Sequence, residues 1–453
     1  MKDLLEDAAR RAIAYLDGMA ERRVAPDEAA IAALSALRRP LPAAPQPAGQ
    51  TLRELDELGS PATLGMNGGR FFGFVIGAAL PVSIASNWLT TAWDQNAALH
   101  ASSPGVAAFE SVALDWLLDL LQLPATAGGA FVTGATMANF SALAAARHAL
   151  LKREGWNVEA DGLFGAPPLT VVIGEEAHPT LLKSLGMLGL GRKRVVRVPV
   201  DGQGRMHAEC LPALHGPTIL CTQAGNVNTG AFDPFEPLVA AARAHGAWVH
   251  VDGAFGLWAA ASPAHAHLVR GLGGADSWAT DAHKWLNVPY DSGLALVRDA
   301  HALRAAMAIT ADYLPTESEF RNPSDYTPEL SRRARGVDVW AALRTLGRGG
   351  VAALVERCCA HARRFAEELA AMGCPVLNEV VLNQVLVSFG DADTTRRVIA
   401  ALQREGTLWA GPTVWQGRTA MRLSVSSWAT SDDDVTRSLA AIRRLIPSGA
   451  SSP

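Results

Sequence analysis

The chain has 453 residues, of which 49% are hydrophobic and 19% charged, so it is long enough for two or three domains around a large core and has the composition of a well-packed enzyme. Its 40 basic and 44 acidic residues give a formal net charge of −4, which argues against a nucleic acid or an anionic membrane as its partner. Apolar runs long enough to span a membrane are not found.

The cysteines and the amino-terminal residues indicate a cytoplasmic protein. The five cysteines are odd in number and lack the spacing of metal ligands, which is typical of reduced, structural thiols. Residues 1–7 carry acids where a signal peptide carries bases, so secretion is not expected.

Residues 1–60 are predicted to form a helical amino-terminal segment. Apolar residues recur at helical spacing over 4–16, and a second helix is expected over 27–37. Prolines at 40, 42, 45 and 47 then stop regular structure. These helices have little chain of their own to cover their apolar faces, so we expect them to pack on the main body or across a dimer.

Residues 61–335 are predicted to form a large α/β domain. Its first motif, over 128–139, places small residues and a hydroxyl where a long helix begins, which lets backbone N–H groups reach a phosphate. No Gly-Lys-Ser/Thr follows, so the motif is not a P-loop. Taken alone, the motif is a weak signal, and a capped, tightly packed helix start explains it as well.

From residue 169 to residue 300, short apolar runs alternate with helical segments. The candidate strands are 169–173, 195–200, 218–222, 247–251, 276–280 and 293–297. Such runs favour a largely parallel sheet covered on both faces. Ligands of such sheets bind beyond the carboxyl ends of the strands. Because His178, Asn226, Asp252 and Lys284 all lie just after a predicted strand or at its end, we expect them to share one site.

Lys284 lies in Thr-Asp-Ala-His-Lys-Trp, residues 280–285, between two predicted strands. Desolvation penalises an ammonium, so a lysine in this setting is a candidate nucleophile for carbonyls. A pyridoxal phosphate site requires a lysine and an acid. Lys284 supplies the lysine, and Asp252, at the end of a neighbouring buried strand, supplies the acid. The alternative is a solvated loop lysine. A metal site built on His250 and Asp252 lacks a third ligand at a plausible spacing, so no metal is predicted.

The remaining segments are a candidate lid and a carboxy-terminal domain. Residues 301–335 are irregular and are either a mobile lid or a surface loop. Residues 336–453 are predicted to form a small α+β domain, with helices over 351–372, 394–405 and 432–445 and strands over 380–389 and 421–425.

These motifs together resemble the group II pyridoxal-phosphate-dependent amino-acid decarboxylases, the family of the aromatic-amino-acid, glutamate and tyrosine decarboxylases. Residues 281–286, Asp-Ala-His-Lys-Trp-Leu, are similar to the family's Asn-Pro-His-Lys-Trp-Leu, and residues 250–254, His-Val-Asp-Gly-Ala, to its His-Val-Asp-Ala-Ala. Residues 128–136, Ser103-Pro104 and residues 230–233 match in order and spacing as well. The resemblance covers the chain from about Phe71 to its end.

The resemblance implies fold type I architecture, pyridoxal 5'-phosphate as cofactor, and a homodimer with active sites at its interface. It implies that Lys284 forms a Schiff base with the cofactor, that Asp252 holds the pyridinium nitrogen, and that His178 and Ala254 contact opposite faces of the ring. The phosphate would be bound by Ala135, Thr136 and His283.

Some positions depart from the family pattern. Asp281 replaces a phosphate-neighbouring asparagine, where an anion would repel phosphate unless turned away or screened, so Thr280 is expected to take over some contacts. Asn226 stands for one of a pair of threonines near the cofactor. His100 replaces a tryptophan of the aromatic-amino-acid enzymes, which makes it a candidate reader of a polar substrate. Tyr326 is a candidate proton donor on the lid, and Arg422 a candidate for binding a substrate carboxylate.

The predicted function is the decarboxylation of an L-amino acid to an amine and CO2. The same carbanion chemistry also serves carbon–carbon lyases, aldolases and aldehyde synthases, which are the nearest alternatives. A more distant alternative is a catalytically silent protein that binds the cofactor and serves as a scaffold.

Overall fold

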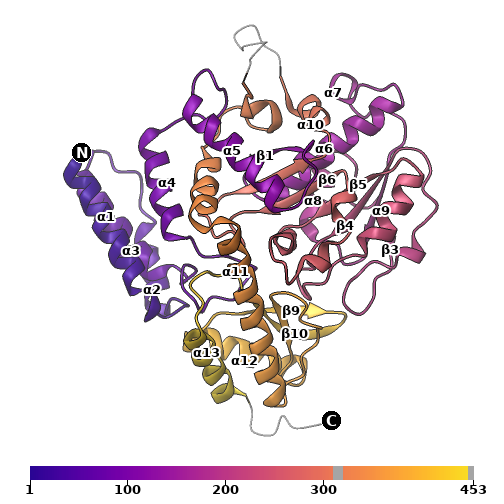
Figure 1. Ribbon diagram of the computed structural model, residues 1–453. Helices are drawn as coiled ribbons and strands as arrows, with labels where there is room; N and C mark the ends of the chain where they lie inside the picture. The colour runs from indigo at the N-terminus through magenta and orange to yellow at the C-terminus, as the bar shows by residue number, and fades with distance from the viewer. Residues whose placement is uncertain (310–319, 447–453) are drawn as a thin grey trace. The chain divides into compact units, whose positions relative to one another are not determined.

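The computed structural model describes residues 1–309 and 320–446, which form two compact units (Figure 1). The larger unit comprises Ala79–Ala360 and Asn378–Gln384. The smaller unit comprises Met1–Ala78, His361–Leu377 and the described residues from Val385 onward. The first 78 residues thus belong to the same compact unit as carboxy-terminal segments. The predicted division of the chain into domains at residues 60 and 335 stays a prediction.

The larger unit is built on a mixed, mostly parallel sheet, which confirms the predicted α/β fold class. Within the described residues the sheet has seven strands in the order β1-β7-β6-β5-β4-β2-β3. β2 to β6 pair in parallel, whereas β7 runs antiparallel to both β6 and β1. The strands are β1 Gly128–Val132, β2 Thr170–Gly174, β3 Val196–Val198, β4 Thr218–Gln223, β5 Trp248–Asp252, β6 Ser277–Asp281 and β7 Gly293–Val297.

Helix α6, Ala135–Arg153, brings its amino-terminal end to the candidate site. It follows β1 after a two-residue turn and packs against β5, β6 and β7 (Figure 1). Alanine has the highest helix propensity, and its small side chain lets a helix approach a sheet closely. The buried face of α6 is accordingly rich in alanine, with Ala138, Ala142, Ala144, Ala145 and Ala146 in the core.

The larger unit contains further helices. Their bounds are α4 Pro81–Trp93, α5 Pro104–Leu120, α7 Val158–Asp161, α8 Pro179–Met187, α9 Phe235–Ala244 and α10 Ala300–Met307. Of these, α5, α9 and α10 contact the sheet. Helix α11, Arg335–Ala371, is kinked at Gly347 and continues into the segment that belongs to the smaller unit. The predicted lid at 301–335 contains α10 and a short 3₁₀ helix, Pro323–Tyr326, and its residues 310–319 lie outside the described residues.

The smaller unit combines amino-terminal helices with a small antiparallel sheet. The helices are α1 Lys2–Asp17, α2 Glu28–Ala33, α3 Ala48–Ala62, α12 Ala392–Glu405 and α13 Asp432–Leu445. Three strands in the described residues have the order β8-β10-β9, with bounds Gln384–Val387, Arg418–Ser424 and Gly411–Trp415. Among the described helices of both units, none has the length and apolar character that crossing a bilayer requires.

Candidate active site

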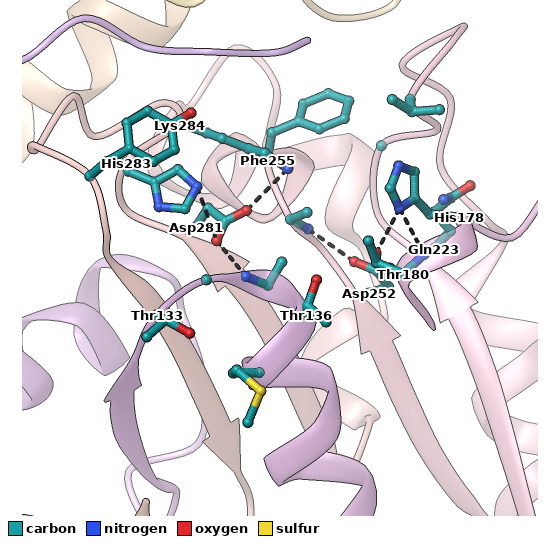
Figure 2. Close-up of a pocket in the computed structure, with 17 residues that line it drawn as sticks. Thr133, Thr136, His178, Thr180, Gln223, Asp252, Phe255, Asp281, His283 and Lys284 are labelled. Atoms are coloured by element: carbon teal, nitrogen blue, oxygen red, sulfur yellow. Dashed lines mark hydrogen bonds and ion pairs between the residues drawn. The ribbon is translucent and has the colours of Figure 1, made fainter. Parts of the chain in front are cut away.

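A cavity of 360 Å³ lies in the larger unit at the carboxyl ends of the parallel strands (Figure 2). The ends of β4, β5 and β6 reach it, together with the amino-terminal ends of α6 and α8. The cavity is lined by Thr133, Gly134, Ala135, Thr136, Met137, His178, Thr180, Gln223, Gly225, Val227, Asp252, Ala254, Phe255, Asp281, His283, Lys284 and Tyr290. This is the edge at which such sheets bind ligands.

Asp252, the last residue of β5, is buried and faces the cavity. Its carboxylate accepts a hydrogen bond from the backbone N–H of Ala254 at 3.4 Å. Burial raises the pKa of Asp252, whereas the charges of His178 and Lys284 act in the opposite direction. A cationic ligand group beside Asp252 would further favour the ionised form, so this carboxylate is suited to a protonated ring nitrogen.

Behind Asp252, a network of buried side chains links β5 to α6 and β6. His250 lies two residues before Asp252 on the same strand, with its Nε2 2.8 Å from Asn139 Oδ1 and its Nδ1 2.8 Å from Ser277 Oγ. Trp248 Nε1 donates to the Ser277 hydroxyl at 2.8 Å, which leaves the hydroxyl hydrogen to His250 Nδ1. Burial lowers the pKa of His250 to about 3, so the ring is neutral with its proton on Nε2, directed at Asn139. The network thereby fixes the orientation of the Asn139 amide.

His178 is held in a defined orientation at the start of α8. Its Nδ1 accepts the backbone N–H of Thr180 at 3.3 Å and lies 2.7 Å from the Thr180 hydroxyl. Because Nδ1 is an acceptor, a neutral ring carries its proton on Nε2. Figure 2 shows His178 and Thr180 on the same side of the cavity as Asp252.

A buried carboxylate occupies the amino-terminal end of α6. Asp281 is the last residue of β6, and its side chain is 3% exposed. Its Oδ1 accepts the backbone N–H of Ala135 at 2.6 Å, and its Oδ2 lies 3.1 Å from Lys284 Nζ (Figure 2). His283 Nε2 lies 3.6 Å from Oδ1. Three donors therefore surround one anionic group at the positive end of a helix dipole.

The ring of His283 presents a donor to this anion. The backbone N–H of Ser292 donates to His283 Nδ1 at 3.1 Å, so the proton of a neutral ring lies on Nε2, toward Asp281. Desolvation lowers the pKa of His283, which favours the neutral ring. Tyr290, which is half-exposed, stacks on it with ring centroids 4.1 Å apart.

The structure brings most of the predicted site residues into this one cavity. Those lining it are Lys284, Asp252, His178, Ala135, Thr136, His283 and Ala254. Thr280 and Asn226 are not among its described lining residues. The Thr280 hydroxyl donates to the carbonyl of Ala254 at 3.4 Å, and the Asn226 side chain accepts the backbone N–H of Asn228 in its own turn. Both residues are buried behind the lining, where they order the segments that contribute Ala254 and Val227.

The predicted substrate and lid residues are placed elsewhere in the described chain. His100 stacks on Phe320 with ring centroids 4.1 Å apart, and the guanidinium carbon of Arg321 lies 4.2 Å from the centroid of the Tyr326 ring. Arg422 lies on β10 of the smaller unit, where burial lowers its pKa to about 10. None of the three predicted residues is among the described residues lining the cavity, so their roles stay predictions.

Several lining residues were missed by the sequence analysis, most clearly Gln223, Phe255 and Tyr290. Gln223 is the last residue of β4 and pairs with Asp252 in the parallel register. The strand-end rule that selected Asp252 applies equally to Gln223, so a signal was present in the sequence. Phe255 and Tyr290 lie in loops, where hydrophobic periodicity gives no orientation.

Comparisons with known proteins identify the family of this chain. The model of the pyridoxal-dependent decarboxylase conserved domain matches residues 63–389. L-2,4-diaminobutyrate decarboxylase of Rhizobium meliloti (strain 1021) is 31% identical over 379 residues, which cover 79% of this chain and 72% of the relative. Tryptophan decarboxylase 1 of Oryza sativa subsp. japonica is 27% identical over 430 residues, covering 86% and 83%. The crystal structure of Oryza sativa TDC with PLP and tryptamine superimposes with a TM-score of 0.91 at 24% identity, covering 98% and 97% of the two chains.

The fold and the cavity define a pyridoxal-phosphate enzyme of fold type I. More narrowly, the chain belongs to the family of the pyridoxal-dependent decarboxylases, and it is therefore a carboxy-lyase that uses pyridoxal phosphate. The predicted family, fold class, enzyme class and cofactor are thereby confirmed.

The residues of the cavity fit this cofactor. The donors around Asp281 have the chemistry that a phosphate ester needs, and Asp252 suits a ring nitrogen. The backbone is close-packed at this point, because a Cβ added to Gly293 would lie 2.4 Å from Gly134 Cα. One feature opposes the fit: the donors that a phosphate requires are already engaged by the Asp281 carboxylate.

Proposed function

We propose that this chain converts an L-amino acid into the corresponding amine and CO2, with Lys284 as the residue that binds the cofactor covalently. The observation that carries the proposal is the meeting of Lys284, Asp252 and the amino-terminal end of α6 in one cavity. Bound pyridoxal phosphate supplies an electron sink for the carbanion that is left when CO2 departs.

The chain's own residues have separable roles in this proposal. The Lys284 amine is the nucleophile for the cofactor aldehyde. Asp252 would keep the ring nitrogen protonated through its negative charge. His178 and Ala254 would contact the ring, and Ala135, Thr136 and His283 would hold the phosphate. Thr280 and Asn226 act as positioning residues, since their side chains order the loops after β5 and β4.

The proposal includes a cytoplasmic homodimer. The carbon that loses CO2 takes up a proton, and the resemblance assigns this proton to the lid residue Tyr326. Tyr326 is not among the described residues lining the cavity of its own chain. We infer that it serves the cavity of the partner chain in the dimer.

The first experiment tests the covalent link to the cofactor. Purified protein with pyridoxal phosphate should show an absorbance band near the visible edge that borohydride removes, and peptide mapping should then find the cofactor on Lys284. The variant Lys284→Ala should lose both signals. Lys183→Ala, which changes an exposed lysine on α8, is the matched control and should retain them.

The second experiment identifies the reaction. A panel of L-amino acids is screened for CO2 release, and the organic product is identified. Amine with stoichiometric CO2 supports the decarboxylase. Aldehyde as the main product favours an aldehyde synthase, and carbon–carbon cleavage without CO2 favours a lyase or aldolase. Failure of the wild-type chain to bind pyridoxal phosphate would overturn the proposal.

A further inference from the structure

Asp281 carries a further inference, because it lies where the proposed function places the cofactor's phosphate. Its carboxylate engages the backbone N–H of Ala135 and the ammonium of Lys284, and the Nε2–H of His283 faces it. The Asp281 side chain is 3% exposed, so solvent contributes little to its stabilisation. The groups that could bind a phosphate are therefore already engaged by an anion that belongs to the protein itself.

We propose that Asp281 is an internal competitor for the cofactor phosphate and that this competition controls the reactivity of Lys284. With the carboxylate in place, Lys284 is paired as an ammonium, which has no lone pair with which to attack an aldehyde. A phosphate that takes the Ala135 N–H displaces the carboxylate and releases Lys284. The inference rests on the proposed function, since it concerns how the same site accepts its cofactor.

The charges at the site make simultaneous occupancy unfavourable. A phosphate monoester carries close to two negative charges at neutral pH, and Asp281 adds a third. The nearby positive charge is that of Lys284, since His283 is held neutral by burial and by the Ser292 N–H on its Nδ1. Like charges in a poorly solvated site repel strongly. The carboxylate therefore has to leave its present contacts when phosphate binds.

In this arrangement the phosphate group contributes to binding of the cofactor, and it is also required for Lys284 to react. Pyridoxal, which has the same aldehyde but no phosphate, cannot displace Asp281 and should meet a blocked lysine. Inorganic phosphate added in trans should displace the carboxylate and restore the reaction. Asp281 would thus be a residue that determines specificity for phosphorylated aldehydes.

The test measures covalent trapping in the absence of amino-acid substrate. A neutral Lys284 amine condenses with an aldehyde to form a C=N bond with release of water, and borohydride reduces that bond by adding hydride to carbon, with a proton taken up at nitrogen. The protein is incubated with pyridoxal phosphate, with pyridoxal, or with pyridoxal plus inorganic phosphate. The label on Lys284 is then quantified by mass spectrometry.

In the wild type we expect pyridoxal alone to label at least about tenfold more slowly than pyridoxal phosphate, a ratio that corresponds to ~1.4 kcal/mol, and inorganic phosphate to narrow this gap. In Asp281→Asn, which lacks the charge, labelling by pyridoxal should be faster and independent of phosphate. The control is Asp291→Asn, which removes a nearby half-exposed charge that pairs with Arg335 and does not contact Lys284. It should behave like the wild type.

The outcomes separate the two proposals. If wild-type Lys284 reacts with pyridoxal as fast as with pyridoxal phosphate, or if Asp281→Asn keeps the wild-type phosphate dependence, the competition is refuted while the proposed function stands. If pyridoxal phosphate itself fails to label Lys284, the proposed function fails and the inference fails with it. The titration of the wild type with inorganic phosphate needs no variant, so it remains decisive if Asp281→Asn does not fold.

Discussion

The buried histidine behind the active-site acid makes the stability of this protein depend on pH in a predictable direction. His250 is fully buried, and its pKa in the folded chain is about 3, compared with about 6.5 for an unfolded histidine. Between these two values the unfolded chain binds a proton at this position and the folded chain does not, so acid favours unfolding. The contribution of His250 to stability is complete above pH 6.5 and is lost as the pH falls toward 3. From pH 7.5 to pH 4.5 the expected loss is about 2.7 kcal/mol, at ~1.36 kcal/mol per pH unit below the unfolded pKa.

The variant His250→Gln isolates this contribution. Glutamine has an amide that can still donate toward Asn139 but does not titrate, and it gives up the bond to Ser277, so at pH 7.5 the variant should be less stable by ~1–3 kcal/mol. The free energy of unfolding of the apoprotein is measured by urea titration from pH 7.5 to 4.5 at one protein concentration. The stability advantage of the wild type over the variant should decrease by about 2.7 kcal/mol from pH 7.5 to pH 4.5, so that the two free energies of unfolding become similar or change order. Burial raises the pKa of Asp233 to about 6, so this residue favours the folded chain toward acid, in the opposite direction to His250. Because wild type and variant share Asp233, its contribution cancels in the difference between their free energies of unfolding. His245→Gln, on the surface after α9, should show no such decrease, and a constant difference for His250→Gln would refute the reasoning.

Two further predictions concern the cofactor site and the lid. Gly293→Ala would place a Cβ 2.4 Å from Gly134 Cα and push the start of α6 outward. The affinity for pyridoxal phosphate should therefore fall at least about tenfold, or ~1.4 kcal/mol. This affinity is measured by titration of the visible absorbance. Gly105→Ala, whose Cβ would meet nothing within 4 Å, is the control, and equal affinities for Gly293→Ala and the wild type would contradict the packing argument. Tyr326→Phe should slow amine formation and raise the share of aldehyde by-product in single-turnover product analysis, because its hydroxyl is the proposed proton donor. Kinetics and product ratio identical to the wild type would remove Tyr326 from the mechanism.

Strands that are buried on both faces were predicted well, because continuous apolar runs bounded by polar turns need little tertiary information. The strand expected over 293–297 has those bounds, and those expected over 218–222 and 247–251 are shifted or extended by one residue. Strand β1 was missed because it begins with two glycines, which have low strand propensity, and it is stabilised by antiparallel pairing with β7. Helix α3 was missed because the prolines before it indicated irregular structure, whereas Pro47 in fact precedes its first turn.

The candidate site was predictable to the extent that its chemistry lies at strand ends. Asp252 and Lys284 end or follow strands of one sheet, so topology alone brings them together. Tyr326 and His100 lie on irregular segments, and Arg422 lies in the other compact unit, so strand order does not bring them to the cavity. Residues whose placement depends on loop conformation or on a partner chain are beyond what periodicity and motif spacing can determine.

Charged side chains show the same limit most clearly, because their partners are distant in sequence. Arg332 is followed in the sequence by Arg333 and Arg335, yet its guanidinium is buried and bonded to Glu110 at 2.8 Å and to the carbonyl of Phe131 at 2.7 Å. From the sequence, Asp281 was expected to repel phosphate unless it is turned away or screened. The structure places its Oδ1 on the backbone N–H of Ala135, 146 residues earlier in the chain, and its Oδ2 3.1 Å from Lys284 Nζ. A motif thus specifies which groups enter a site, whereas segments remote in sequence decide which of those groups meet. In this protein the contact between Asp281 and the remote residue Ala135 shows how a departure from the family pattern can control the reactivity of Lys284, and this control can be tested.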